Sequence, residues 1–146
     1  MRPSAVVGHS TVSPCLLVES IPNELRFLET VFGAQVQQQL VGQEGAVWQV
    51  EVRLGDVILM IGRAHQANTP ATGMLYVRTD DVDATCTRAV EQGATLISVP
   101  TDQPSGVREA GFRDPQGHIW WIGQQMRKLS NREVERRLAE QRRKRL

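Results

Sequence analysis

The sequence predicts an α+β fold of two βαβββ modules whose mixed sheets form a cleft or a partial barrel, with a charged helix at the C-terminus. The first observation behind this prediction is a turn followed by an apolar strand, which occurs at residues 54–62 and again within residues 112–123. In the second copy, Pro115 fixes φ at one turn position and Gly117 tolerates a positive φ. Both copies end in Ile-Gly, which indicates a repeated unit.

The second observation is the spacing of a Gly-Ala pair that follows each expected helix. These pairs begin at Gly33 and Gly93, which lie 60 positions apart. Together with the repeated turn and strand, this spacing indicates a tandem duplication, with modules at residues 12–63 and 73–125. We therefore expect functional residues where the two modules face each other.

Hydrophobic periodicity predicts the elements of the first module. Leu25, Leu28 and Val31 recur at helical spacing. Ser20 suits the N-cap of this helix, and Gly33 suits the position that ends it. We expect a strand, a helix and three further strands at residues 12–20, 22–32, 35–41, 48–54 and 56–63.

The same order of elements is expected in the second module, after a linker at residues 64–72. Asp80 or Asp81 caps its helix, and Gly93 closes it. A loop is expected at residues 100–105. The strands are expected at residues 73–79, 95–99, 106–113 and 118–125.

Composition indicates a globular protein of one domain's length, with 146 residues of which 40% are hydrophobic and 23% are charged. No apolar run approaches the ~20 residues of a membrane helix, and the N-terminus lacks the apolar core of a signal peptide. Cys15 and Cys86 follow no metal-binding or disulfide pattern, so we expect buried, reduced thiols. These observations predict a cytoplasmic protein without a membrane partner.

Charge is divided unevenly along the chain. Residues 127–146 hold nine basic and three acidic side chains, a net charge of +6, whereas residues 1–126 hold eight basic and thirteen acidic side chains, a net charge of −5. Ser130 begins a capping-box pattern, so a basic helical tail is expected at residues 127–146. Val134 and Leu138 give this helix only a thin apolar stripe, so it should dock weakly.

Five short motifs occur in a specific order within residues 12 to about 125: Phe32-Gly33-Ala34, Leu54-Gly55-Asp56, Asp80-Asp81-Val82-Asp83, Gly93-Ala94-Thr95 and Asp114-Pro115-Gln116-Gly117-His118-Ile119-Trp120. In order and spacing they resemble the vicinal oxygen chelate superfamily, which has the glyoxalase/bleomycin-resistance/dioxygenase fold, and most closely its PhnB-like branch. The resemblance implies a single domain of two modules at residues 1–126. It also implies a cleft that two chains often complete together, so we expect a homodimer.

Enzymes of that superfamily bind a divalent cation through His, Glu or Gln side chains on the first and last strands of each module. The resemblance places these positions at Ser13, Met60, Met74 and Trp121. None of the four is a ligand for a hard divalent cation, and methionines on apolar strands commonly belong to the core. We therefore expect no metal and no cofactor.

Other polar candidates alternate with apolar residues along the strands. Gln49 and Glu51 point away from the helix-packed face, either toward the cleft or onto a solvated rim. Arg108 shares a face with Phe112 and either holds an anionic ligand group or forms a structural ion pair. His118 is expected to be a surface turn residue.

The remaining candidates are aromatic and thioether side chains. Trp121, Met60, Met74 and Phe112 are expected to line the cleft, and Trp120 to point to the helix layer because side chains alternate along a strand. Such a wall suits stacking on a flat, partly apolar ligand. The alternative is that these side chains fill the cleft.

The sequence leaves three functions open. The first is a binding protein of the bleomycin-resistance kind for a small organic molecule. The second is a lyase, isomerase or oxygenase-type enzyme of the superfamily, with metal or non-metal chemistry. The third is an interaction module whose basic tail binds nucleic acid or an acidic partner, although the acidic body and the lack of tail aromatics argue against nucleic acid. The expected ligand-binding residues are Ser13, Gln49, Glu51, Met60, Met74, Arg108, Phe112 and Trp121.

Overall fold

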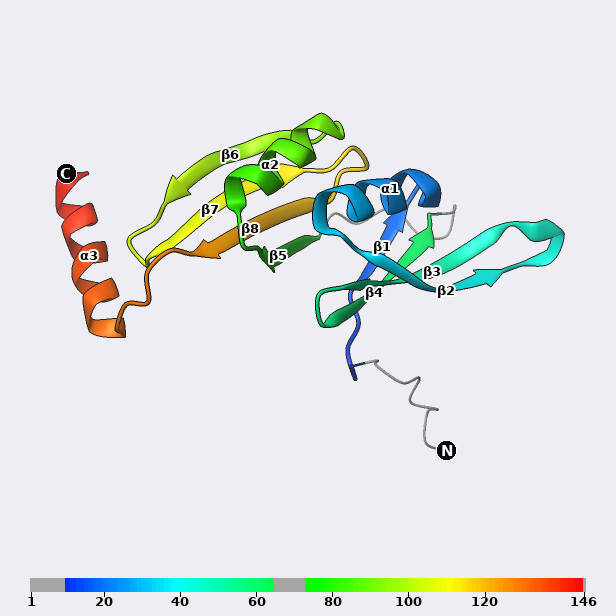
Figure 1. Ribbon diagram of the computed structural model, residues 1–146, viewed down its shortest axis with the longest axis horizontal. Helices are drawn as coiled ribbons and strands as arrows, with labels where there is room; N and C mark the ends of the chain where they lie inside the picture. Colours follow the sequence, from blue (N-terminus) through cyan, green and yellow to red (C-terminus); the bar gives the residue numbers. More distant parts are fainter. Residues whose placement is uncertain (1–9, 65–72, 146) are drawn as a thin grey trace. The chain divides into compact units, whose positions relative to one another are not determined.

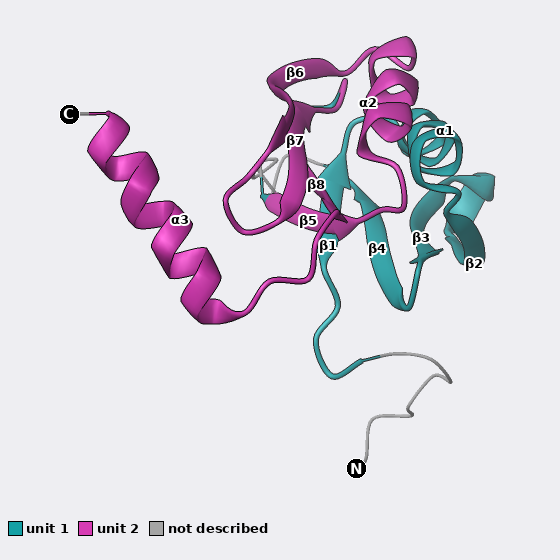
Figure 2. Ribbon diagram, turned by 60° about the vertical axis from the view of Figure 1, so that its left-hand side comes forward, with its two compact units in different colours: residues 1–73, 116–118 teal, residues 74–115, 119–146 magenta. Residues whose placement is uncertain are grey.

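The computed structural model describes residues 10–64 and 73–145 of the chain. The chain divides into two compact units, coloured separately in Figure 2. Unit 1 comprises residues 1–73 and 116–118, and unit 2 comprises residues 74–115 and 119–146. Of the predicted linker, all but Ala64 lies outside the described residues.

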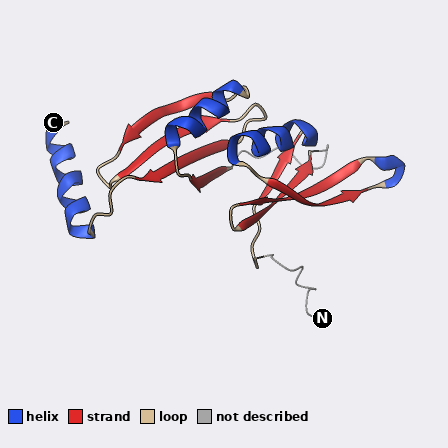
Figure 3. Ribbon diagram, viewed as in Figure 1, coloured by secondary structure: helices blue, strands red, loops and turns tan. Residues whose placement is uncertain are grey.

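Unit 1 is a four-stranded mixed sheet with a helix on one face (Figures 1 and 3). The strand order is β1-β4-β3-β2, in which β1 runs parallel to β4 and the other neighbours are antiparallel. Its elements are β1 (Cys15–Val18), α1 (Ile21–Phe32), β2 (Gln35–Val41), the 3-10 helix η1 (Gln43–Gly45), β3 (Val47–Leu54) and β4 (Val57–Arg63).

Helix α1 forms where the sequence predicts it, because its capping residues and its apolar face indicate the same helix bounds. The Asn23 backbone N–H donates to the Ser20 hydroxyl at 3.3 Å, which satisfies a free donor of the first turn. Gly33 follows the last turn with a left-handed φ of 67°, a conformation that glycine adopts without strain. Phe27 and Leu28 are buried, so the apolar face of the helix belongs to the core of unit 1.

Unit 2 repeats this plan with the strand order β5-β8-β7-β6, and β5 runs parallel to β8. Asp81, rather than Asp80, caps the helix by accepting a hydrogen bond of 3.0 Å from the Ala84 backbone N–H. The second strand of unit 2, which lies at the edge of its sheet, includes residues 100–102, which the sequence predicts as loop; an edge strand tolerates Pro100. The elements are β5 (Met74–Arg78), α2 (Val82–Glu91), β6 (Thr95–Asp102), β7 (Val107–Arg113), β8 (Ile119–Gln125) and α3 (Asn131–Lys144). The predicted α+β fold of two βαβββ modules with a C-terminal helix is confirmed.

The core of unit 2 contains Trp120, whose side chain is 0% exposed. It pairs across the sheet with Phe112, which is also fully buried. The Trp120 indole N–H donates to the Asp114 carboxylate at 2.9 Å, so its polar atom is satisfied within the core. The prediction that Trp120 points to the helix layer is confirmed.

Helix α3 begins after Ser130 as predicted, and the Ser130 hydroxyl accepts a hydrogen bond from the Glu133 backbone N–H at 3.2 Å. None of its described residues is buried. Arg136 and Arg137 instead form ion pairs with Glu133 at 2.6 and 3.0 Å. Side-chain pairs one turn apart therefore support this helix more than packing does.

Asp114 and His118, at the two ends of the turn, are buried, contrary to the prediction that His118 is a surface residue. His118 is 2% exposed, and its Nε2 lies 3.0 Å from the Leu17 carbonyl oxygen, 101 positions earlier in the chain. The Gln116 amide accepts from the Ser20 backbone N–H and donates to the Ser20 carbonyl, both at 2.8 Å. The prediction failed because this partner strand is remote in sequence.

Both cysteines are free thiols. Cys86 is buried, as predicted, and burial raises the pKa of its thiol. Cys15 is exposed, which contradicts the prediction, because it lies at the start of β1 and not within its buried part. Among the described helices, none combines the length and apolar character needed to cross a bilayer.

Candidate functional site

Each sheet has one face covered by its helix and one face without a helix. Residues paired across neighbouring strands point to the same face, so the register determines which side chains share it. In unit 2 the uncovered face carries Met74 and Tyr76 from β5, Trp121 from β8 and Glu109 from β7. These four residues define what we call the aromatic face.

Two glycines allow the aromatic side chains to approach the sheet. The Trp121 indole lies over Gly111, where an added Cβ would meet it at 2.9 Å. The Tyr76 hydroxyl lies over Gly123, where an added Cβ would fall well inside contact distance. Any larger residue at either position would displace a ring, so Gly111 and Gly123 form the floor of the aromatic face.

Tyr76 is linked to Glu109 across this floor. The Glu109 side chain lies close enough to the Tyr76 hydroxyl to affect its pKa. The pKa of Tyr76 is raised, chiefly by burial and then by the charge of Glu109, while Arg78 opposes the shift. The Tyr76 hydroxyl is therefore neutral at neutral pH.

The aromatic face is open to solvent at its β5 side. Met74 is 61% exposed and Tyr76 is 47% exposed, whereas Trp121 is half-buried. Exposed aromatic and thioether surface beside a carboxylate provides apolar contact and one polar anchor. This combination is suited to recognition of a flat molecule that carries a hydrogen-bond donor.

Two predicted binding residues lie on the opposite, helix-covered face of this sheet. Phe112 is 0% exposed beside Trp120, so the prediction that it lines a cleft is wrong. The Arg108 guanidinium donates to both carboxylate oxygens of Asp83 on α2 at 2.9 Å and to Asp102 at 3.0 Å. Of the two roles predicted for Arg108, the structure therefore contains the ion pair.

These ion pairs shift the pKa values of both Asp83 and Arg108. Hydrogen bonding from Arg108 lowers the pKa of Asp83, and the two carboxylates raise the pKa of Arg108. The guanidinium is thus held between α2 and the end of β6, on the face away from Trp121. It contributes to the fold of unit 2 and not to the aromatic face.

Unit 1 also has an uncovered face. Met60 on β4 pairs with Cys15 on β1 and with Glu51 on β3, so these three side chains form a row across the sheet. Gln49 lies two residues from Glu51 on the same face, while the intervening Val50 is buried. The predicted orientation of Gln49 and Glu51, away from α1, is confirmed.

The sequence missed the residues that lie directly beside Met60 and Trp121. The structure pairs Met60 with Cys15 and Trp121 with Tyr76, whereas the resemblance placed Ser13 and Met74 at these positions. Ser13 precedes β1 altogether. The internal repeat does not distinguish the two choices, because both pairs are separated by 61 positions (76 − 15 and 74 − 13).

The donors at the positions where the resemblance places the superfamily's metal ligands do not fit a hard divalent cation. Ser13, Met60, Met74 and Trp121 provide a hydroxyl, two thioethers and an indole, and none of these is a carboxylate or an imidazole. Within residues 10–64 and 73–145, no group of three His, Cys, Asp or Glu side chains has the geometry to hold a metal ion.

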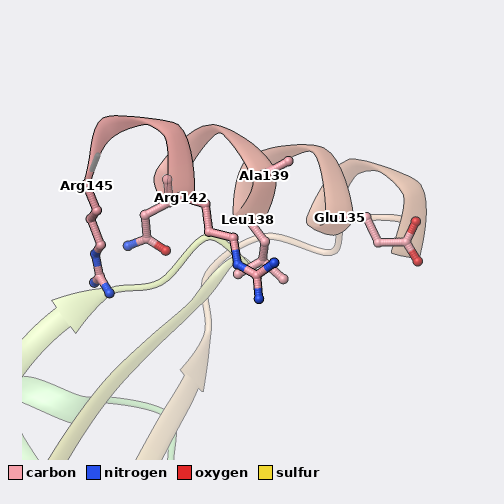
Figure 4. Close-up of a pocket in the computed structure, with 6 residues that line it drawn as sticks. Glu135, Leu138, Ala139, Arg142 and Arg145 are labelled. Carbon is pink, nitrogen blue, oxygen red and sulfur yellow. The ribbon is translucent and has the colours of Figure 1, made fainter.

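Two surface hollows in unit 2 lie elsewhere. One, of about 400 Å³, is lined by residues of the β6–β7 connection and the segment before α3, including Asp102, Gly106 and Arg127. The other, of about 600 Å³, follows one side of α3, where Leu138 and Arg142 project together (Figure 4). Neither hollow includes Tyr76 or Trp121, so the aromatic face is a platform and not part of these hollows.

Comparison with known proteins gives a family and several similar structures. Residues 7–122 match the model of the Glyoxalase/Bleomycin resistance protein/Dioxygenase superfamily. An uncharacterised protein of Mycobacterium bovis is 28% identical over 148 aligned positions, covering 94% of this chain and 97% of its own.

Among solved structures, TioX from Micromonospora sp. ML1 has a TM-score of 0.67 at 23% identity, covering 80% of this chain and 98% of TioX. A PhnB protein from Bacillus cereus, described as a putative 3-demethylubiquinone-9 3-methyltransferase, has a TM-score of 0.66 at 16% identity, covering 79% of this chain and 99% of its own. At these identities the likeness concerns the fold.

Proposed function

Because the chain belongs to the Glyoxalase/Bleomycin resistance protein/Dioxygenase superfamily, we propose that it is a binding protein for a small, partly aromatic organic molecule. The ligand lies against the aromatic face of unit 2. The observation that carries this proposal is the pair of aromatic side chains, Trp121 and Tyr76, lying over Gly111 and Gly123 on a face without a helix.

The proposal follows from the chemistry of these side chains. An indole offers a large flat surface for stacking, and Met74 offers a polarisable, adaptable one beside it. Glu109 is a carboxylate acceptor near the Tyr76 hydroxyl. A ligand with its own N–H or O–H group can share that carboxylate, which gives the site polar selectivity.

The uncovered face of unit 1 is proposed as a second contact surface for such ligands. Its residues Gln49, Glu51 and Met60 combine amide, carboxylate and thioether groups, a mixture similar to that of the aromatic face. The alternative is an enzyme of the superfamily, which the test below distinguishes from a binding protein. The binding protein is favoured because the donors that metal chemistry needs are missing from the positions where the resemblance places them.

We further propose that the chain belongs to the PhnB-like branch, that it acts as a homodimer and that it works in the cytoplasm. The PhnB protein of Bacillus cereus supports the first point through its fold. The free thiols of Cys15 and Cys86 support the third, because unpaired thiols, one of them exposed, suit a reducing compartment.

Isothermal titration calorimetry with a panel of planar bicyclic and tricyclic aromatic amines and acids tests the proposed function. We expect at least one compound to bind, and Trp121→Ala to weaken its binding by about 1–3 kcal/mol, the range typical of stacking on an aromatic side chain. Met126→Ala is the matched control, since Met126 is a large apolar side chain of unit 2 that is 53% exposed and lies outside the aromatic face.

Binding that survives Trp121→Ala unchanged, or a complete absence of binding across the panel, would contradict the proposal. Conversion of a panel compound during the titration, followed by mass spectrometry, would instead support an enzyme of the superfamily. Loss of binding in Met126→Ala alone would move the site to the hollow that Met126 lines.

A further inference from the structure

The edge strand β2 is the least covered strand of unit 1. Six of its seven residues are exposed. The hairpin of β2 and β3 extends past the end of α1 (Figure 1), and α1 packs on β3 and β4 instead. We name the outer part of this hairpin, residues 38–49, the arm.

The arm exposes large apolar side chains. Leu40 is 52% exposed, and Val41 and Trp48 are each 58% exposed. The Trp48 indole lies over Gly42 near the end of the hairpin, so it is held against the arm. A tryptophan and two aliphatic side chains exposed in one hairpin are typical of a surface that is covered by a partner.

The corresponding edge strand of unit 2, β6, has features that hinder pairing with a strand of another chain, and β2 lacks them. In β6, Pro100 removes a backbone donor and Asp102 adds a charge, two features that prevent edge-to-edge pairing. The β2 sequence, Gln35-Val36-Gln37-Gln38-Gln39-Leu40-Val41, contains neither a proline nor a charged residue. Register shifts interrupt both strands, so bulges do not account for the difference.

We propose that β2 pairs antiparallel with β2 of a second copy of this chain, around a two-fold axis at Gln39. A strand that pairs with itself places like residues opposite one another, so charged residues would repel; the uncharged β2 avoids this penalty. This self-complementarity favours a second copy over an unrelated protein as the occupant.

The register of β2 supports an axis at this position. Between its two register shifts, Gln38, Gln39 and Leu40 pair regularly with β3. An axis at Gln39 places Gln38 opposite Leu40 of the second copy on one face and the two Gln39 side chains opposite each other on the other face. The Gln39 amides then have a donor and an acceptor each for a mutual hydrogen bond.

A charge-exchange experiment tests this axis. By sedimentation velocity, the wild-type protein is expected to be a dimer at micromolar concentration. Gln39→Lys and Gln39→Glu are each expected to be single chains, because like charges would lie directly opposite across the axis. An equimolar mixture of the two variants is expected to restore the dimer, since opposite charges then face each other.

The matched controls are Val99→Lys and Val99→Glu, which place the same charges on exposed β6, 60 positions after Gln39. Both controls are expected to remain dimers. Trp48→Ala should weaken dimerisation by at least about tenfold if the second copy covers the exposed Trp48 indole of the arm. Thermal unfolding monitored by circular dichroism establishes that each variant is folded.

A wild-type protein that sediments as a single chain up to roughly 100 µM, a range that includes weak dimers, would overturn the proposal. A dimer that survives both Gln39 substitutions would overturn it too, as would an equimolar mixture of Gln39→Lys and Gln39→Glu that stays monomeric. A different polypeptide that co-purifies with a single-chain wild type and is lost in Gln39→Lys would assign the arm to another partner and also overturn it.

Discussion

Trp120 is enclosed in the core of unit 2, and the next residue, Trp121, lies on the uncovered face of the same sheet. The alternation of side chains along β8 is the whole cause of this difference. Trp120 needs a buried hydrogen-bond acceptor and has one in Asp114, whereas Trp121 needs only a flat floor and has one in Gly111. One residue therefore stabilises the fold while its neighbour remains available to a ligand.

Tyr76 allows a clean test at the residue scale because it is the only tyrosine in the chain. In the folded protein its pKa is raised above the ordinary value of 10.0 by burial and by Glu109. Glu109→Gln removes the charge and is expected to lower the pKa of Tyr76 toward that value. Absorbance titration of tyrosinate formation measures the shift, and Glu51→Gln in unit 1 is the control.

The sign of the linked stability effect follows from the raised pKa. Stabilisation by the neutral hydroxyl is fully present below the unfolded pKa and is lost as the pH rises through the folded pKa of Tyr76. The wild type should therefore lose more stability than Glu109→Gln above about pH 10, measured by urea unfolding. An unchanged tyrosine titration in Glu109→Gln would show that Tyr76 and Glu109 are not coupled.

Residue-scale predictions from the sequence succeeded where local alternation decides and failed where a distant contact decides. The orientation of Trp120 relative to Trp121, and of Gln49 and Glu51 relative to α1, follows from alternation alone. The burial of His118 depends on Leu17, which no local pattern connects to it. Phe112 was placed wrongly because its face was inferred without the pairing of β7 and β8.

At the scale of elements, the Gln116 side chain forms hydrogen bonds at the junction of β1 and α1, and we call this contact of Gln116 with Ser20 and Glu24 the clasp. The Gln116 side chain bonds both backbone groups of Ser20, and its amide nitrogen lies 3.2 Å from the Glu24 carboxylate. Glu24 is buried in the first turn of α1, and Ser20 and Gln116 are half-buried, so these bonds are partly shielded from water. Hydrogen bonds in such a setting are costly to remove because their backbone partners lose them without replacement.

We expect Gln116→Ala to destabilise the protein by about 1–3 kcal/mol, the cost of leaving buried hydrogen-bonding groups without a partner. Urea unfolding measures this change, and hydrogen exchange should show faster opening at the start of α1. Gln125→Ala is the control, because Gln125 is an exposed glutamine at the end of β8. Equal stability of Gln116→Ala and Gln125→Ala would mean that the clasp contributes nothing.

The order of elements was predictable from sequence, because helix caps and apolar periodicity are local signals. Ser20, Gly33 and Ser130 mark helix ends in the structure as they do in the sequence. The ends of strands were less predictable. Proline normally ends a strand, so β6 was expected to stop before Pro100; its position at the sheet edge explains why it continues.

At the scale of the whole molecule, the duplication was apparent from spacing, but the residues of the proposed site were not. Spacing relates Ser13 to Met74 and equally Cys15 to Tyr76, so only the strand register distinguishes them. Glu109 carried no sequence signal at all, because its role depends on Tyr76 reaching across Gly123.

The donor chemistry also makes a prediction for the whole protein. Because the resemblance places hydroxyl, thioether and indole groups where the superfamily's enzymes hold a metal, we expect the purified chain to contain far less than one divalent transition metal ion per molecule. Inductively coupled plasma mass spectrometry of the protein, prepared without added chelator, measures this. A stoichiometric metal whose removal abolishes ligand binding would contradict both this expectation and the proposed binding mode.

Unit 1 is assembled from two stretches of chain that are made at different times. Residues 116–118 belong to it, although the residues on either side of them belong to unit 2. During synthesis from the N-terminus, the clasp between Gln116 and the β1–α1 junction therefore cannot form until most of the polypeptide has left the ribosome. A gene fragment that encodes only residues 1–73 would lack this clasp, whatever its local propensities.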